Sequence, residues 1–240
     1  MSSKISETRR NFMRTSAVVI PVVTLGASLL HSALAAPAPV ALGDYKPVFF
    51  TADEWTFIQA ACDRLIPASA DGPGALETNV PVFLDKELNG DYGHASDWYL
   101  EGPFDVHASP DLGYQLPYTP REVYRRGIAA ASKFAMQQHG KPFDALDDAT
   151  RDQVLTQLEK NEADFSAFNE SQLTASGFFG TLLTDTKQGY LSDPKYGGNK
   201  GMGAWKMIGF PGARASYAEW IDQHNVPYPL GPVALDGSRG

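Results

Sequence analysis

Two helix-initiation signals constrain the fold of this chain most strongly. Each is a capping box, in which a threonine at the helix N-cap and a glutamate three residues later exchange hydrogen bonds with each other's backbone amides. The two boxes span Thr51–Glu54 and Thr119–Glu122, and the second has Pro120 at the first helical position, where an amide is not needed. Apolar residues follow both boxes at helical spacing. Alternation between apolar and polar residues, which would indicate a strand, does not extend beyond four residues anywhere in the sequence. The sequence therefore predicts an all-α fold.

Further helices are expected between these signals and after them. Apolar periodicity and flanking glycine, asparagine and proline residues set their limits. The predicted helices cover residues 51–65, 80–88, 119–140, 150–161, 171–188 and 213–223, with Gly189 as the C-terminal cap of the fifth. Long ordered loops join them, including an aromatic-rich loop at 91–118 and a glycine-rich segment at 192–203. Loops of this length in a compact domain tend to be binding surfaces.

The first 35 residues are predicted to be a cleavable export signal. Arg9 and Arg10, followed by Phe12, form the pattern that the twin-arginine translocon recognises. Small residues favour cleavage between Ala35 and Ala36, and an uncleaved membrane anchor is the alternative. The twin-arginine route carries folded proteins, often because a cofactor is inserted or subunits assemble before export. We therefore expect a cofactor on this chain or on a partner.

The remaining 205 residues are enough for one domain. We expect an extended arm at 36–48, a single irregular helical domain at 49–226 and an extended tail at 227–240. The full sequence has 20 Lys and Arg against 28 Asp and Glu; the signal contains four of the basic residues and one acidic residue, which leaves 16 against 27, a net charge of −11. Such an acidic chain is a poor match for nucleic acid, because binding to phosphates needs a basic surface.

Motifs for an independent active site are missing from the sequence. Cys62 is the only cysteine, so the chain alone can form no disulfide, covalent haem attachment or iron–sulfur site. Its place on an apolar helical stripe predicts a buried, unreactive thiol. Phosphate-loop, zinc-protease and serine-hydrolase patterns do not occur. The histidines have no metal-ligand spacing, and four carboxylates near turns are interpreted as solvated rather than as calcium ligands: Asp71, Glu77, Asp85 and Asp91.

Four segments resemble a known family, the small (gamma) subunit of membrane-bound, flavin-dependent gluconate 2-dehydrogenase, also called subunit 3. The resemblance runs from about Phe49 to Gly212. It rests on AACDRLIP at 60–67, DGPGA at 71–75, DPKYGGNKG at 193–201 and WKMIGFPG at 205–212. The resemblance implies a periplasmic complex attached to the inner membrane, in which this subunit has no catalytic, cofactor or metal site of its own.

The same resemblance implies the partners. They are a large FAD-dependent dehydrogenase subunit and a multi-haem cytochrome c subunit, with FAD and haem c, and an iron–sulfur cluster as a further candidate, all on those partners. This subunit would stabilise the flavoprotein and lend it the signal for the twin-arginine translocon. We place the partner interface on six aromatic residues, because aromatic anchors dominate interfaces: Tyr92, Trp98, Tyr99, Tyr196, Trp205 and Phe210. The alternative is that Trp205 and Phe210 cover this domain's own core.

Alternatives remain at this point. Related small subunits serve fructose, glucose, sorbitol and 2-ketogluconate dehydrogenases, so the partner sets the substrate. A free-standing periplasmic sugar-binding protein would use the loop at 91–118 to stack aromatic rings on a pyranose. An independent hydrolase would need the scattered carboxylates and histidines to converge in the fold.

Overall fold

A computed structural model describes residues 40–105 and 108–240, and within them the domain is helical. Seven α-helices occur there, with short 3-10 turns between them and three isolated β-bridges but no β-strand. The helices are α2 (Ala52–Leu65), α3 (Val80–Asn89), α4 (Asp91–His94), α5 (Pro120–His139), α6 (Asp148–Glu159), α7 (Ala175–Leu191) and α8 (Gly203–Ile208). The all-α prediction is confirmed. The predicted export signal and its cleavage site at Ala35–Ala36 lie outside the described residues.

Both capping boxes begin the helices they predict. The Glu54 carboxylate accepts from the Thr51 amide at 2.8 Å, and Glu122 accepts from the Thr119 amide at 2.8 Å. Gly140 ends α5 in the left-handed conformation, with φ of 66°. These signals act through hydrogen bonds between residues three apart, so they form wherever the rest of the chain packs.

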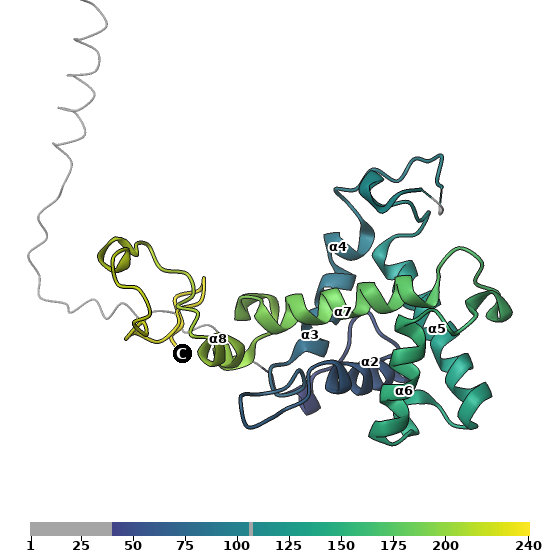
Figure 1. The fold of residues 1–240 in the computed structure, drawn as a ribbon, viewed down its shortest axis with the longest axis horizontal. Coiled ribbons are helices and arrows are strands. Elements are labelled where there is room, and N and C mark those ends of the chain that lie inside the picture. Colours follow the sequence, from purple (N-terminus) through teal and green to yellow (C-terminus); the bar gives the residue numbers. More distant parts are fainter. Residues whose placement is uncertain (1–39, 106–107) are drawn as a thin grey trace, which may run out of the picture. The chain divides into compact units, whose positions relative to one another are not determined.

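Helix α7 lies at the centre of the helical packing (Figure 1). It contacts α2, α3, α5 and α6, and α8 follows beyond its C-terminal end. The core is aromatic where these helices meet: the Phe178 ring of α7 lies 6.1 Å from Tyr124 of α5 and 6.4 Å from Phe57 of α2. All three side chains are fully buried. Burial of such rings contributes about 1.5–3 kcal/mol each relative to exposure.

The end of α7 corrects one prediction. Gly189 does not cap the helix, which continues to Leu191. Gly189 is buried where α7 meets α3, and a Cβ atom there would lie 2.7 Å from Cδ1 of Phe83. Gly198 passes even closer, because its Cβ would lie 2.1 Å from the Gly189 carbonyl oxygen. These glycines therefore allow close packing rather than a helix stop.

The C-terminal region corrects another prediction. Residues 213–223 do not form a helix; only the 3-10 turn Ala218–Trp220 is present. The Ala213 amide donates instead to the Val233 carbonyl at 2.7 Å, next to a parallel bridge between Gly212 and Val233. The segment 227–240, expected to be an extended tail, returns to the domain through this pairing. Tertiary hydrogen bonds thus replace those that a helix would make.

The sequence suggested that Asp85 is a solvated turn carboxylate, but this prediction is wrong. Asp85 is fully buried on α3 and holds the segment that precedes α2. Oδ1 accepts from the amides of Phe49 and Phe50 at 2.9 Å each, and Oδ2 accepts from the Val48 amide at 2.7 Å and the Tyr45 hydroxyl at 2.8 Å. One carboxylate therefore anchors residues 45–50 against the core, where both phenylalanine rings are buried.

Candidate partner-binding surface

The predicted aromatic loop begins with a short helix that the sequence analysis missed. Helix α4 (Asp91–His94) positions Tyr92 so that its hydroxyl donates to the carboxylate of Asp185 on α7, at 2.9 and 3.1 Å. Tyr124 of α5 donates to the same carboxylate at 2.9 Å. Asp185 is 4% exposed, so three helices converge on one buried acid. No sequence motif marks it, because its partners are 61 and 93 residues away.

The pKa of Asp185 is raised from 3.8 to about 6. Burial is the main cause, since it disfavours the charged form, and nearby Glu87 adds to it; the two tyrosine hydrogen bonds oppose both effects. Burial and the adjacent Asp185 also raise the pKa of Tyr92 and Tyr124. At neutral pH the site therefore holds an ionised carboxylate between two protonated phenols.

A pocket of about 400 Å³ opens above this carboxylate, between α5 and α7. The aromatic loop supplies one wall, with Trp98 against Tyr92 and Tyr114. The other residues that line it come from α5 and α7: Pro120, Val123, Gly180, Thr181, Thr184, Asp185 and Gln188. Two of the predicted interface residues, Tyr92 and Trp98, thus belong to a pocket. Tyr99 next to them is 80% exposed and is available to a partner.

The other three predicted interface residues, Tyr196, Trp205 and Phe210, differ in their exposure. Trp205 of α8 is 5% exposed, its indole N–H donates to the Leu191 carbonyl at 2.8 Å, and it packs within this domain in a small buried cluster with Met202 and Ala234. Phe210 packs edge-to-face on Trp205 with ring centroids 5.0 Å apart but remains 45% exposed. Tyr196 is 43% exposed. Of this group, only Tyr196 and Phe210 present substantial surface.

The glycine-rich segment before α8 is a structural junction. The buried Asn199 side chain donates to the Ser192 carbonyl at 3.0 Å and accepts from the Ala204 amide at 2.9 Å. Asp193 accepts from the Leu235 amide at 2.7 Å, which holds the returning C-terminal segment. These contacts explain the Gly, Asn and Asp content of the segment without a bound phosphate.

An apolar surface beside Trp205 was not predicted from the sequence. Met207, Ile208 and Phe210 are 42–56% exposed at the end of α8, and the segment after them exposes Ile221, Val226, Leu230 and Leu235. Contiguous exposed apolar surface, as at Met207, Ile208 and Phe210 at the end of α8, is typical of interaction sites. The signal in the sequence is the apolar pair Met207–Ile208, which follows Trp205 after a single lysine, Lys206.

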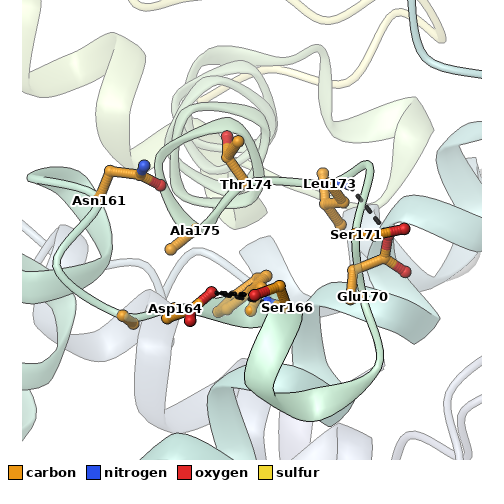
Figure 2. A pocket seen from close by; sticks show the side chains of 10 residues that line it. Asn161, Asp164, Ser166, Glu170, Ser171, Leu173, Thr174 and Ala175 are labelled. Atoms are coloured by element: carbon orange, nitrogen blue, oxygen red, sulfur yellow. Dashed lines mark hydrogen bonds between the residues drawn. The ribbon is translucent and has the colours of Figure 1, made fainter.

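Glu170 forms a further polar site near the N-terminal end of α7, beside a pocket of about 330 Å³ (Figure 2). It is 5% exposed and accepts from the amides of Gln172 and Leu173 at 3.0 Å each, from Arg126 at 3.1 Å and from Tyr118 at 3.3 Å. Burial raises its pKa, but these donors outweigh burial and lower it overall. Its acceptor capacity is used within the domain, so we interpret it as a structural carboxylate.

The remaining chemical features of residues 40–105 and 108–240 concern metal binding, membrane spanning and the single thiol. These residues contain no cluster of three or more histidine, cysteine or acidic side chains placed to hold a metal ion. In the same ranges, no helix combines the length and apolar character needed to cross a bilayer. Cys62 is fully buried, and burial raises the pKa of its thiol to about 12, as expected for an unreactive cysteine.

Comparison with known proteins places these features in a family. The model of gluconate 2-dehydrogenase subunit 3 matches residues 52–212, which is more than half of the chain and includes every α-helix of the described residues. The chain therefore belongs to the gluconate 2-dehydrogenase subunit 3 family. No curated protein and no solved structure matched the chain. The exposed apolar residues 221–235 lie beyond the family match.

Proposed function

We propose that this chain is the non-catalytic small subunit of a periplasmic, FAD-dependent gluconate 2-dehydrogenase complex. In this complex a flavoprotein subunit oxidises D-gluconate to 2-dehydro-D-gluconate, and the substrate's two electrons pass from FAD through a cytochrome c subunit to quinone. This chain stabilises the flavoprotein and escorts it through the twin-arginine pathway. Membership of the subunit 3 family carries the proposal.

The surface of the domain supports a binding role. Tyr99 is 80% exposed, and Ile208 and Phe210 are 56% and 45% exposed. Interfaces between subunits draw most of their binding energy from a few such aromatic and apolar anchors, which lose contact with water on assembly. We therefore assign flavoprotein contacts to Tyr99 and to the apolar surface around Phe210.

The escort role is tested by producing the chain together with its flavoprotein and cytochrome partners. Replacing both twin arginines, Arg9→Lys with Arg10→Lys, should leave the flavoprotein in the cytoplasm, because the translocon reads that pair. Lys4→Arg, at a basic residue ahead of the same arginine pair, is the matched control and should leave export unchanged. Normal periplasmic dehydrogenase activity in the double variant would refute the escort role.

The assigned contacts are tested by co-purification. Tyr99→Ala and Phe210→Ala should each weaken capture of the flavoprotein by about tenfold or more, the effect of removing an interface anchor. Met136→Ala, at a residue 48% exposed on α5 and outside both surfaces, is the control. Equal capture by all three variants would contradict the assignment. Activity of the purified complex on gluconate, fructose, glucose, sorbitol and 2-ketogluconate identifies the substrate.

A further inference from the structure

The proposed function does not assign a role to the pocket above Asp185. The pocket lies between α5 and α7 and has a volume of about 400 Å³, within the range of small-molecule sites. On α7, residues 180, 181, 184, 185 and 188 follow helical spacing, so one stripe of that helix forms the floor. The open side carries Trp98 and Tyr114, which are 38% and 40% exposed.

The aromatic rings stand nearly at right angles to one another. Tyr92 and Trp98 have ring centroids 6.0 Å apart and planes 73° apart; Trp98 and Tyr114 have centroids 5.0 Å apart and planes 69° apart. Rings arranged in this way form adjacent walls rather than a stack. Each pair is in edge-to-face contact, and a ring face that stays open toward the pocket attracts a cation.

Three hydroxyl donors around the pocket are committed within the domain, whereas the Thr184 hydroxyl, the Gln188 amide and the Trp98 indole N–H have no hydrogen bond to the described residues. The Tyr92 hydroxyl donates to Asp185, the Tyr114 hydroxyl donates to the Tyr118 carbonyl at 2.5 Å, and the Thr181 hydroxyl donates to the Gly177 carbonyl at 3.0 Å. The three free donors suit any ligand that carries an acceptor and do not select its charge. A carboxylate and aromatic faces remain, and both favour a ligand that carries positive charge.

The charge distribution points the same way. Among the residues that line the pocket, Asp185 is the only acid and there is no lysine, arginine or histidine. Glu87 and Glu122 lie close enough to act electrostatically on Asp185 and Tyr114 respectively. Because burial weakens screening by water, this negative field acts over the pocket more strongly than it would at an open surface.

We propose that the pocket binds an alkylammonium group. Tyr92, Trp98 and Tyr114 form the aromatic wall around the cation, and Asp185 supplies the counter-charge from the floor. Two sources share this chemistry: a free quaternary amine and the side chain of a lysine on another protein. The proposal does not depend on the dehydrogenase assignment, because it concerns binding by this chain alone.

The test is a titration of the purified full chain with choline, followed by calorimetry and by tryptophan fluorescence. The neutral isostere 3,3-dimethyl-1-butanol has the same shape without the charge. We expect choline to bind at least about tenfold more tightly than the isostere, as cation–π attraction and a buried carboxylate together require. Absence of choline binding, or equal binding of the isostere, would overturn the proposal.

Variants locate the binding in this pocket. Asp185→Asn keeps an oxygen acceptor for the tyrosine hydroxyls but removes the charge, and Trp98→Ala removes one wall; each should weaken choline binding by about tenfold or more. Asp91→Asn changes an exposed carboxylate of α4 that does not line the pocket and should bind choline as the unaltered chain does. Unchanged affinity in both pocket variants would also overturn the proposal.

A second ligand separates the two sources. Nα-acetyl-lysine methyl ester presents a primary ammonium on a lysine side chain. If it binds as tightly as choline, the pocket accepts a lysine from another protein; if only choline binds, the ligand is a free quaternary amine. Both results support an alkylammonium site.

Discussion

Replacing Asp85 by asparagine should weaken the whole domain, because a single carboxylate anchors residues 45–50. The two side chains have nearly the same shape, but one acceptor oxygen becomes an NH₂ group. In the unaltered chain, Oδ2 accepts from the Val48 amide at 2.7 Å and from the Tyr45 hydroxyl at 2.8 Å. If the NH₂ group takes the place of Oδ2, it faces both of these donors. Two hydrogen bonds to a charged group are lost, and buried donors confront each other.

The magnitude follows from these contacts. A hydrogen bond to a charged group contributes about 1.5–3 kcal/mol, so losing two costs about 3–6 kcal/mol. The loss has an upper limit, because the anchored segment can detach while the rest of the domain stays folded. Detachment exposes Phe49 and Phe50, at about 1.5–3 kcal/mol each. Both estimates agree, and we expect the free energy of unfolding to fall by about 3–5 kcal/mol.

Urea denaturation followed by tryptophan fluorescence measures this change, and amide hydrogen exchange at Val48, Phe49 and Phe50 shows whether the segment detaches first. Asp97→Asn removes an exposed carboxylate of the aromatic loop and serves as the control, with an expected change within about 0.5 kcal/mol. If Asp85→Asn is destabilised by less than about 1 kcal/mol and exchange is unchanged, the anchoring role of Asp85 is refuted.

Two further predictions concern stability. In the folded state the pKa of Asp185 is raised from 3.8 to about 6, so the folded state binds the Asp185 proton more tightly than the unfolded state does. The contribution of Asp185 to stability is therefore greatest below pH 4. It falls by roughly 3 kcal/mol between pH 4 and pH 6. Unfolding free energies of the unaltered chain and Asp185→Asn, measured across that range, should diverge accordingly, and a constant difference would contradict the burial argument. In α7, Gly189→Ala should lower the melting temperature because its Cβ would meet Phe83, whereas Gly180→Ala, with open space around its Cβ, should raise stability by about 0.5–1 kcal/mol. Equal shifts in both variants would show that packing at Gly189 is not tight.

The sequence was a good guide to helices whose ends are fixed locally. The boxes at Thr51 and Thr119 place the starts of α2 and α5, because cap and partner are three residues apart. The prediction failed where distant segments compete for the backbone. Gly189 packs against Phe83 of another helix, and Ala213 pairs with Val233 instead of starting a helix. Neither contact has a signal within a local window.

The candidate surface divides in the same way. The sequence alone selected the aromatic loop, by its length and composition, and the four segments that resemble the subunit 3 family. It did not distinguish Trp205, which is buried, from Phe210, which is half-exposed, because both are aromatic residues of one short segment, WKMIGFPG at 205–212.

Local spacing and composition thus determined the helical class, the capped helices and the family. Only the tertiary structure decided the roles of three of the buried carboxylates, Asp85, Asp185 and Glu170. Their hydrogen-bond partners include residues 35 to 93 positions away. A carboxylate beside a turn has the same local sequence whether water or the protein supplies its donors, and the choice depends on which distant segments fold over it.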